Sequence, residues 1–131
     1  MQIKVILLFC FFVSCFSGHS QNNCADFKNG TFKFIDKGSQ RTCILTRDGD
    51  RQTERMEDSE EVYDFTIKWV DSCTYTVSPT IETVRRKKEI SDLGTMTVKI
   101  SPVSDSSYIH LVRVAKSPKF KRRDEVFVVK D

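Results

Sequence analysis

Hydrophobic and polar residues alternate with a period of two along much of this chain. Side chains one apart in a strand point to opposite faces, so alternation is typical of a strand with one face in a core and one in water. Three runs alternate most clearly, and their apolar members are Tyr63, Phe65, Ile67 and Trp69, then Cys73, Tyr75 and Val77, then Met96, Val98 and Ile100. The chain is therefore expected to be rich in strands.

Turn signals divide the chain into eight short predicted strands. Asp48-Gly49-Asp50 is a tight-turn signal, and polar clusters at 71–72 and 102–105 end other runs. A weak helical pattern covers 84–93. The expected strands are 30–36, 41–47, 51–57, 62–70, 73–81, 94–101, 107–114 and 124–130.

This order of strands predicts an all-β domain. Antiparallel strands that follow one another form an up-and-down meander, and closure into a lipocalin-like barrel removes the exposed edges. A two-sheet sandwich is the alternative. In the meander the tight turns fall at one end, which we call the closed end. The long connections 82–92 and 115–123 fall at the other, the open end.

Residues 1–20 have the pattern of a cleaved signal peptide, which leaves 21–131 as a single barrel domain. Lys4 precedes an apolar run that is too short to span a bilayer, and small and polar residues follow it. Cleavage after Ser20 would release a soluble chain into the periplasm or the medium. Cleavage before Cys15 would instead give a lipoprotein, anchored to the membrane through that cysteine alone.

The cysteines after the leader are Cys24, Cys43 and Cys73. Export to an oxidising compartment favours a disulfide. The meander places Cys24 and Cys73 at the closed end and Cys43 at the open end. Bridged α-carbons lie about 5.5 Å apart, whereas a seven-residue strand spans roughly 23 Å. We therefore predict a Cys24–Cys73 disulfide and a free, buried or half-buried Cys43.

Charge suggests one mode of binding at the open end. The basic residues there are Arg85, Arg86, Lys87 and Lys88 in one connection, and Lys116, Lys119, Lys121, Arg122 and Arg123 around Phe120 in the other. Side by side, they would bind an anionic surface or an envelope protein with an acidic face. Alternatively, they are ordinary solvated charges, neutralised by the acidic residues of 57–61.

Inward-facing side chains suggest a second mode of binding. A barrel of eight strands can enclose one small apolar molecule. The predicted lining is Phe32, Phe34, Tyr63, Phe65, Trp69, Tyr75 and Val77. The alternative is that these side chains simply fill the barrel as its core.

Other functions find little support in the sequence. The chain has 21 Lys and Arg against 18 Asp and Glu, a balance that does not favour a nucleic-acid partner. His110 is the single histidine after the leader, and no nucleophile elbow, phosphate-binding loop, zinc ligand set or cofactor motif is present. We expect a monomeric binding module that is not an enzyme and has no cofactor.

Several short motifs point to a family. Cys24-Ala25-Asp26-Phe27, Gly30-Thr31-Phe32-Lys33, Ile67-x-Trp69 and Cys73-x-Tyr75 resemble a group of short, exported, uncharacterised bacterial envelope proteins and lipoproteins. The resemblance covers most of the chain after the leader. It implies an envelope location and also the Cys24–Cys73 pairing. Some members carry a topoisomerase label, which conflicts with a leader that directs the chain away from DNA.

Overall fold

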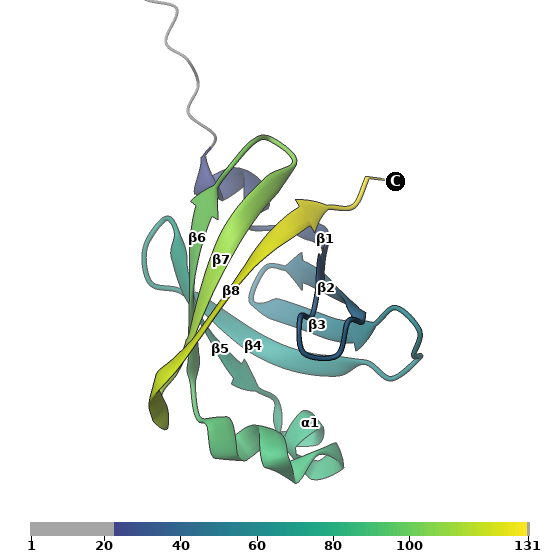
Figure 1. Cartoon of the computed structure of the whole chain (residues 1–131). Helices are drawn as coiled ribbons and strands as arrows, with labels where there is room; N and C mark the ends of the chain where they lie inside the picture. Colours follow the sequence, from purple (N-terminus) through teal and green to yellow (C-terminus); the bar gives the residue numbers. More distant parts are fainter. Residues whose placement is uncertain (1–22, 131) are drawn as a thin grey trace, which may run out of the picture.

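The computed structural model describes residues 23–130 and shows a closed barrel of eight antiparallel strands in sequence order (Figure 1). This confirms the predicted meander and excludes the sandwich. The predicted signal peptide, with Cys15, lies outside the described residues. The strands are β1 (Gly30–Ile35), β2 (Thr42–Asp48), β3 (Arg51–Met56), β4 (Tyr63–Trp69), β5 (Thr74–Pro79), β6 (Met96–Pro102), β7 (Ser107–Val114) and β8 (Ser117–Val128).

The alternating apolar residues form the core, as the sequence predicts. The inward positions of β4, β5 and β6 include Phe65, Ile67, Val77 and Ile100, all buried. Closure between β1 and β8 is short, since only Phe32–Val128 and Lys33–Phe127 are paired there. The barrel is thus continuous but joined by a narrow seam.

A short 3-10 helix, η1 (Cys24–Phe27), covers the closed end. The side chain of Asn23 caps it by accepting a hydrogen bond from the amide of Ala25 at 3.1 Å. Phe27 is buried against Tyr108, with ring centroids 4.9 Å apart. The Cys24–Cys73 disulfide is confirmed, with α-carbons 5.3 Å apart, and it fixes η1 to the end of the barrel. A disulfide is typical of a non-cytoplasmic environment.

The prediction of a long loop over 115–123 is wrong. The β7–β8 turn is confined to Ala115 and Lys116, and β8 begins at Ser117. Residues 117–123 are mostly polar or basic, and the two apolar residues among them, Pro118 and Phe120, did not predict a strand. Ser117 and residues 121–123 pair with β7, while an irregularity at Arg113 and Val114 leaves 118–120 without a partner in the register. This pairing supplies the backbone hydrogen bonds that an extended segment needs.

The connection between β5 and β6 contains two short helices. α1 (Ile81–Arg86) begins after Thr80, whose hydroxyl accepts a hydrogen bond from the amide of Thr83 at 3.3 Å. This cap ends β5 earlier than the sequence predicts. The second helix, the 3-10 helix η2 (Lys88–Leu93), completes the expected helical stretch in two pieces rather than one.

Candidate functional site

The barrel is partly empty in its open half. A cavity of about 120 Å³ lies between side chains of β1, β2, β3 and β5 to β8. Its lining is mostly apolar, with polar side chains from β3, β7 and β8. The lining residues are Phe34, Leu45, Gln52, Glu54, Tyr75, Val77, Met96, Val98, His110, Val112 and Arg122.

A buried arginine lies behind the lining residues Gln52 and Tyr75. Arg47 is 1% exposed and points inward from β2. Its guanidinium donates hydrogen bonds to the carbonyl of Phe27 at 2.9 Å, to the hydroxyl of Tyr108 at 2.7 Å and to the hydroxyl of Tyr75 at 3.2 Å. It also lies over the ring of Phe32, 4.3 Å from the centroid. Arg47 therefore connects the helix at the closed end to the interior of the barrel.

Polar residues of β3 form one wall. Gln52 Nε2 donates a hydrogen bond to Glu54 Oε1 at 2.9 Å, while Gln52 Oε1 lies 3.5 Å from Arg47 Nη1. Glu54 is enclosed by the barrel but keeps some accessible surface, because it faces the cavity. Burial raises the pKa of Glu54, an effect that Gln52 and the two arginines only partly oppose.

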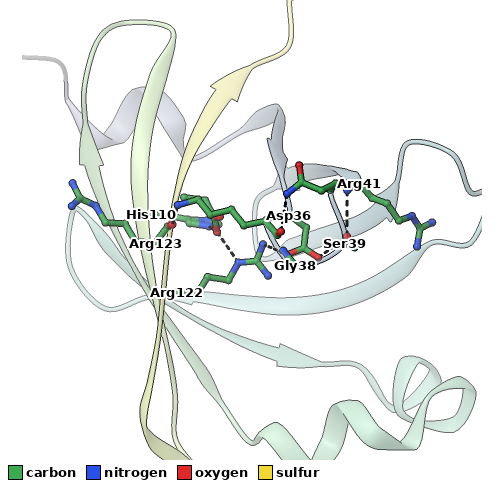
Figure 2. Close-up of polar contacts among 10 residues, drawn as sticks. Asp36, Gly38, Ser39, Arg41, His110, Arg122 and Arg123 are labelled. Carbon is green, nitrogen blue, oxygen red and sulfur yellow. Dashed lines mark hydrogen bonds and ion pairs between the residues drawn. The ribbon is translucent and has the colours of Figure 1, made fainter.

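The opposite wall carries an ion-pair cluster (Figure 2). His110 Nε2 lies 2.8 Å from Asp124 Oδ2, and Arg122 Nε donates to the same oxygen at 2.7 Å. Arg122 Nη2 lies 2.8 Å from Asp36 Oδ1, but it is not directed at that oxygen and makes no hydrogen bond. The guanidinium of Arg122 thus spans the seam between β8 and the β1–β2 turn.

The protonation states in this cluster follow from burial and hydrogen bonding. Burial lowers the pKa of His110, which favours the neutral imidazole although Asp124 acts in the opposite direction. Burial alone would raise the pKa of Asp124, but hydrogen bonds from Arg122 and His110 lower it. Asp124 is thus an ionised acceptor, and the neutral His110 places its proton on Nε2.

The structure confirms that Cys43 is free and buried. Burial, with the charge of Glu54, raises the pKa of its thiol to about 12. The native protein is therefore expected to contain about a thousandfold less thiolate than the unfolded chain at the same pH. Its reaction with a colorimetric disulfide reagent at pH 8 should be slower by at least that factor than in guanidinium chloride. A native rate within tenfold of the unfolded rate would show that the thiol is accessible.

The predicted lining residues divide into three groups. Phe34, Tyr75 and Val77 line the cavity. Phe32 and Phe65 are buried in the packed core, and Tyr63 and Trp69 are half-buried. The barrel is thus filled in its closed half and hollow in its open half.

The predicted basic residues come together at the open end, with one correction. In Figure 1 the β7–β8 turn and the segment with α1 lie at the same end, and Lys116 Nζ donates to the carbonyl of Ser91 at 3.4 Å. Arg122 does not belong to this surface, because its side chain points into the barrel. Arg86 is paired with Glu61 at 3.6 Å and donates to the carbonyl of Val62.

The remaining cations form an exposed surface that we call the basic rim. None of them has a carboxylate partner within 4 Å among residues 23–130. Arg113 belongs to it although the sequence did not point to it, and the β7–β8 register places Arg113 opposite Lys121. The basic rim consists of Arg85, Lys87, Lys88, Arg113, Lys116, Lys119, Lys121 and Arg123.

Most of the polar interior was not predicted from the sequence. Arg47 has the same parity as the buried Cys43 and Leu45, so the alternation of β2 could have placed it inside. The polar character of β3 was the signal for Gln52 and Glu54, since every second residue of a barrel strand faces inward. No such signal was available for the proximity of Asp36 and Arg122, which depends on how the barrel closes.

Within residues 23–130 the helices are too short or too polar to act as membrane-spanning segments. The same residues contain no group of three or more His, Cys, Asp or Glu side chains arranged to share a metal ion.

No protein-family model, curated protein or solved structure matches this chain.

Proposed function

We propose that the protein is a non-enzymatic binding module of the bacterial envelope that attaches to an anionic surface through its basic rim. In this proposal the chain is exported as a periplasmic, secreted or lipid-anchored protein of the family that its motifs resemble. The observation that carries the proposal is the set of exposed basic side chains without ion-pair partners on two separate parts of the chain, the β5–β6 connection and the β7–β8 hairpin. Such a surface attracts anions such as phospholipid headgroups.

Two further features support a binding role for the basic rim. Arg113 and Lys121 lie directly opposite each other on neighbouring strands, an arrangement of like charges that destabilises a sheet. Ile81, Leu93 and Phe120 lie among the basic residues and are 75%, 43% and 46% exposed. Exposed apolar side chains among cations are typical of surfaces that enter the interface of an anionic membrane.

Neutralising part of the basic rim should abolish this binding. The variant R85Q/K88Q/K119Q/K121Q is expected to bind vesicles of mixed phosphatidylglycerol and phosphatidylcholine at least about a hundredfold more weakly. The reason is that each cation near an anionic membrane contributes substantially to the free energy of binding. Flotation of the protein with vesicles measures the change. Binding should also weaken as salt rises, because salt screens exposed charges.

The matched control removes the same charge elsewhere. K33Q/K68Q/K99Q/K130Q changes exposed lysines outside the basic rim and should bind much as the unchanged protein does. Equal weakening in both variants would show that only net charge matters. Binding to vesicles of phosphatidylcholine alone would contradict an electrostatic role for the basic rim.

The cavity favours a second candidate function, that of a carrier for a small molecule. Its volume approaches that of a cavity of about 150 Å³ known to hold benzene, so the occupant would have only a few non-hydrogen atoms. A carrier and a surface-binding module are compatible, because the basic rim lies outside the barrel and the cavity inside it.

A further inference from the structure

We propose that the barrel cavity binds a small ligand with a positively charged ammonium group, held by the carboxylate of Glu54 against an apolar wall. This inference rests on the carrier function and names the class of ligand that the carrier would take. It replaces the purely apolar ligand that the sequence suggested.

Glu54 lacks a cationic partner inside the barrel. Its single side-chain hydrogen bond within residues 23–130 comes from Gln52, on Oε1. Neither arginine of the interior lies within 4 Å of its carboxylate. An enclosed carboxylate without a cation is unfavourable, since desolvation is not offset by an opposite charge. A ligand ammonium group would supply the missing charge and the missing hydrogen-bond donors.

The other polar group of the cavity also accepts a hydrogen bond. His110 donates its Nε2–H to Asp124, so Nδ1 of the neutral ring is left with a lone pair. No hydrogen bond to Nδ1 is found within the described residues. Glu54 and His110 therefore both offer hydrogen-bond acceptors. An ammonium group suits them, because it carries several N–H donors and no acceptor.

The local balance of charge excludes an anion as the preferred ligand. Asp36, Glu54 and Asp124 are the carboxylates of this region, and Arg47 and Arg122 are its guanidinium groups. With His110 neutral and Glu54 ionised, as it would be beside a bound cation, one negative charge is in excess. Arg122 lies against both Asp36 and Asp124, so its charge is balanced although its Nη2 makes no hydrogen bond. Arg47 is held by its hydrogen bonds to Phe27 and Tyr108 and does not line the cavity.

The apolar lining and the volume of the cavity limit the size of the ligand and the character of its uncharged part. Leu45, Val77, Val98 and Val112 contribute aliphatic surface, and Phe34 contributes an aromatic ring. A cavity of about 120 Å³ has room for a short alkyl chain beside the charged group. The ligand class is thus a small alkylammonium ion rather than a lipid.

Three probes of nearly equal size test the inference on the unchanged protein. Butylammonium, butanol and butanoate carry the same alkyl chain with a positive, a neutral and a negative head. We expect butylammonium to bind at least about tenfold more tightly than butanol, with butanoate weakest, because only the cation satisfies Glu54. Methyl resonances of Leu45, Val77 and Val98 in NMR titrations would place the ligand in the cavity.

Each contrary outcome has a separate meaning. If butanol binds as tightly as butylammonium, the carrier function stands and the inference about charge is wrong. If none of the probes perturbs the cavity methyl groups, the carrier function fails and the inference fails with it. Perturbation confined to the acidic loop at 57–61 would show surface binding only and would also overturn the inference.

Two variants check the assignment to Glu54. E54Q preserves the shape of the side chain and should weaken butylammonium binding at least about tenfold, with little effect on butanol. E57Q removes an exposed carboxylate just beyond the same strand and should leave binding unchanged. If E54Q fails to fold, V112F, which fills the cavity from its open side, should abolish butylammonium binding. Retained binding in either folded variant would overturn the inference.

Discussion

Replacing Arg47 by alanine is expected to lower the free energy of unfolding by about 3–5 kcal/mol, as for other large buried side chains that carry hydrogen bonds. The guanidinium is 1% exposed, so its removal leaves a void that water cannot easily fill. The carbonyl of Phe27 loses both of its donors, Nε at 3.2 Å and Nη2 at 2.9 Å. The hydroxyls of Tyr75 and Tyr108 lose the guanidinium group that donates hydrogen bonds to them.

Chemical denaturation monitored by the fluorescence of Trp69 would measure this loss. Arg51→Ala is the matched control, since Arg51 opens the adjacent strand and its exposed side chain pairs only with Asp64 on the surface. The control should leave the denaturation midpoint nearly unchanged. A loss from Arg47→Ala as small as that of the control would mean that the core reorganises around the missing side chain.

Removal of the disulfide is expected to lower the free energy of unfolding by about 4 kcal/mol. Cys24 and Cys73 are 49 residues apart, so the bridge closes a long loop in the unfolded chain and reduces its entropy. The double variant C24A/C73A avoids stray pairing with Cys43. Denaturation curves of this variant and of the unchanged protein give the difference directly, and a loss below about 1 kcal/mol would contradict the entropic explanation.

The two predictions should be coupled, because both interactions hold η1 at the closed end. Once the disulfide is removed, η1 can detach and take the carbonyl of Phe27 with it. Arg47→Ala is then expected to have a smaller effect in the C24A/C73A background than alone, as is usual for residues that share a partner. Strict additivity would show that Arg47 stabilises the barrel independently of η1.

The strands that alternate most clearly are those that the sequence predicted best. Tyr63 to Trp69 occupy β4 with the expected parity, and the limits of β7 agree with the prediction residue for residue. β8 is the failure, because its first half holds Pro118 and Phe120 among polar and basic residues and was interpreted as a charged loop. Hydrogen bonding to β7 makes it a strand, and such pairing is a property of the neighbour rather than of the segment.

The candidate site was less predictable than the barrel. Phe34, Tyr75 and Val77 were identified as lining residues because they are apolar and alternate. Their polar counterparts were not identified, since a charged residue at an inward position looks like an exposed one in the sequence. Arg122 shows this most clearly, because neighbouring basic residues suggested a surface patch while its own parity pointed inward.

By itself, the sequence determined the strand-rich fold, the order of its strands and the Cys24–Cys73 pairing. These follow from a local period of two and from the alternation of strand ends in a meander. Only the tertiary structure brought Glu54, His110 and Arg122 around one cavity and Asp36 beside Arg122. They come from four separate segments, and their proximity depends on the register and closure of the whole barrel, which no local pattern encodes.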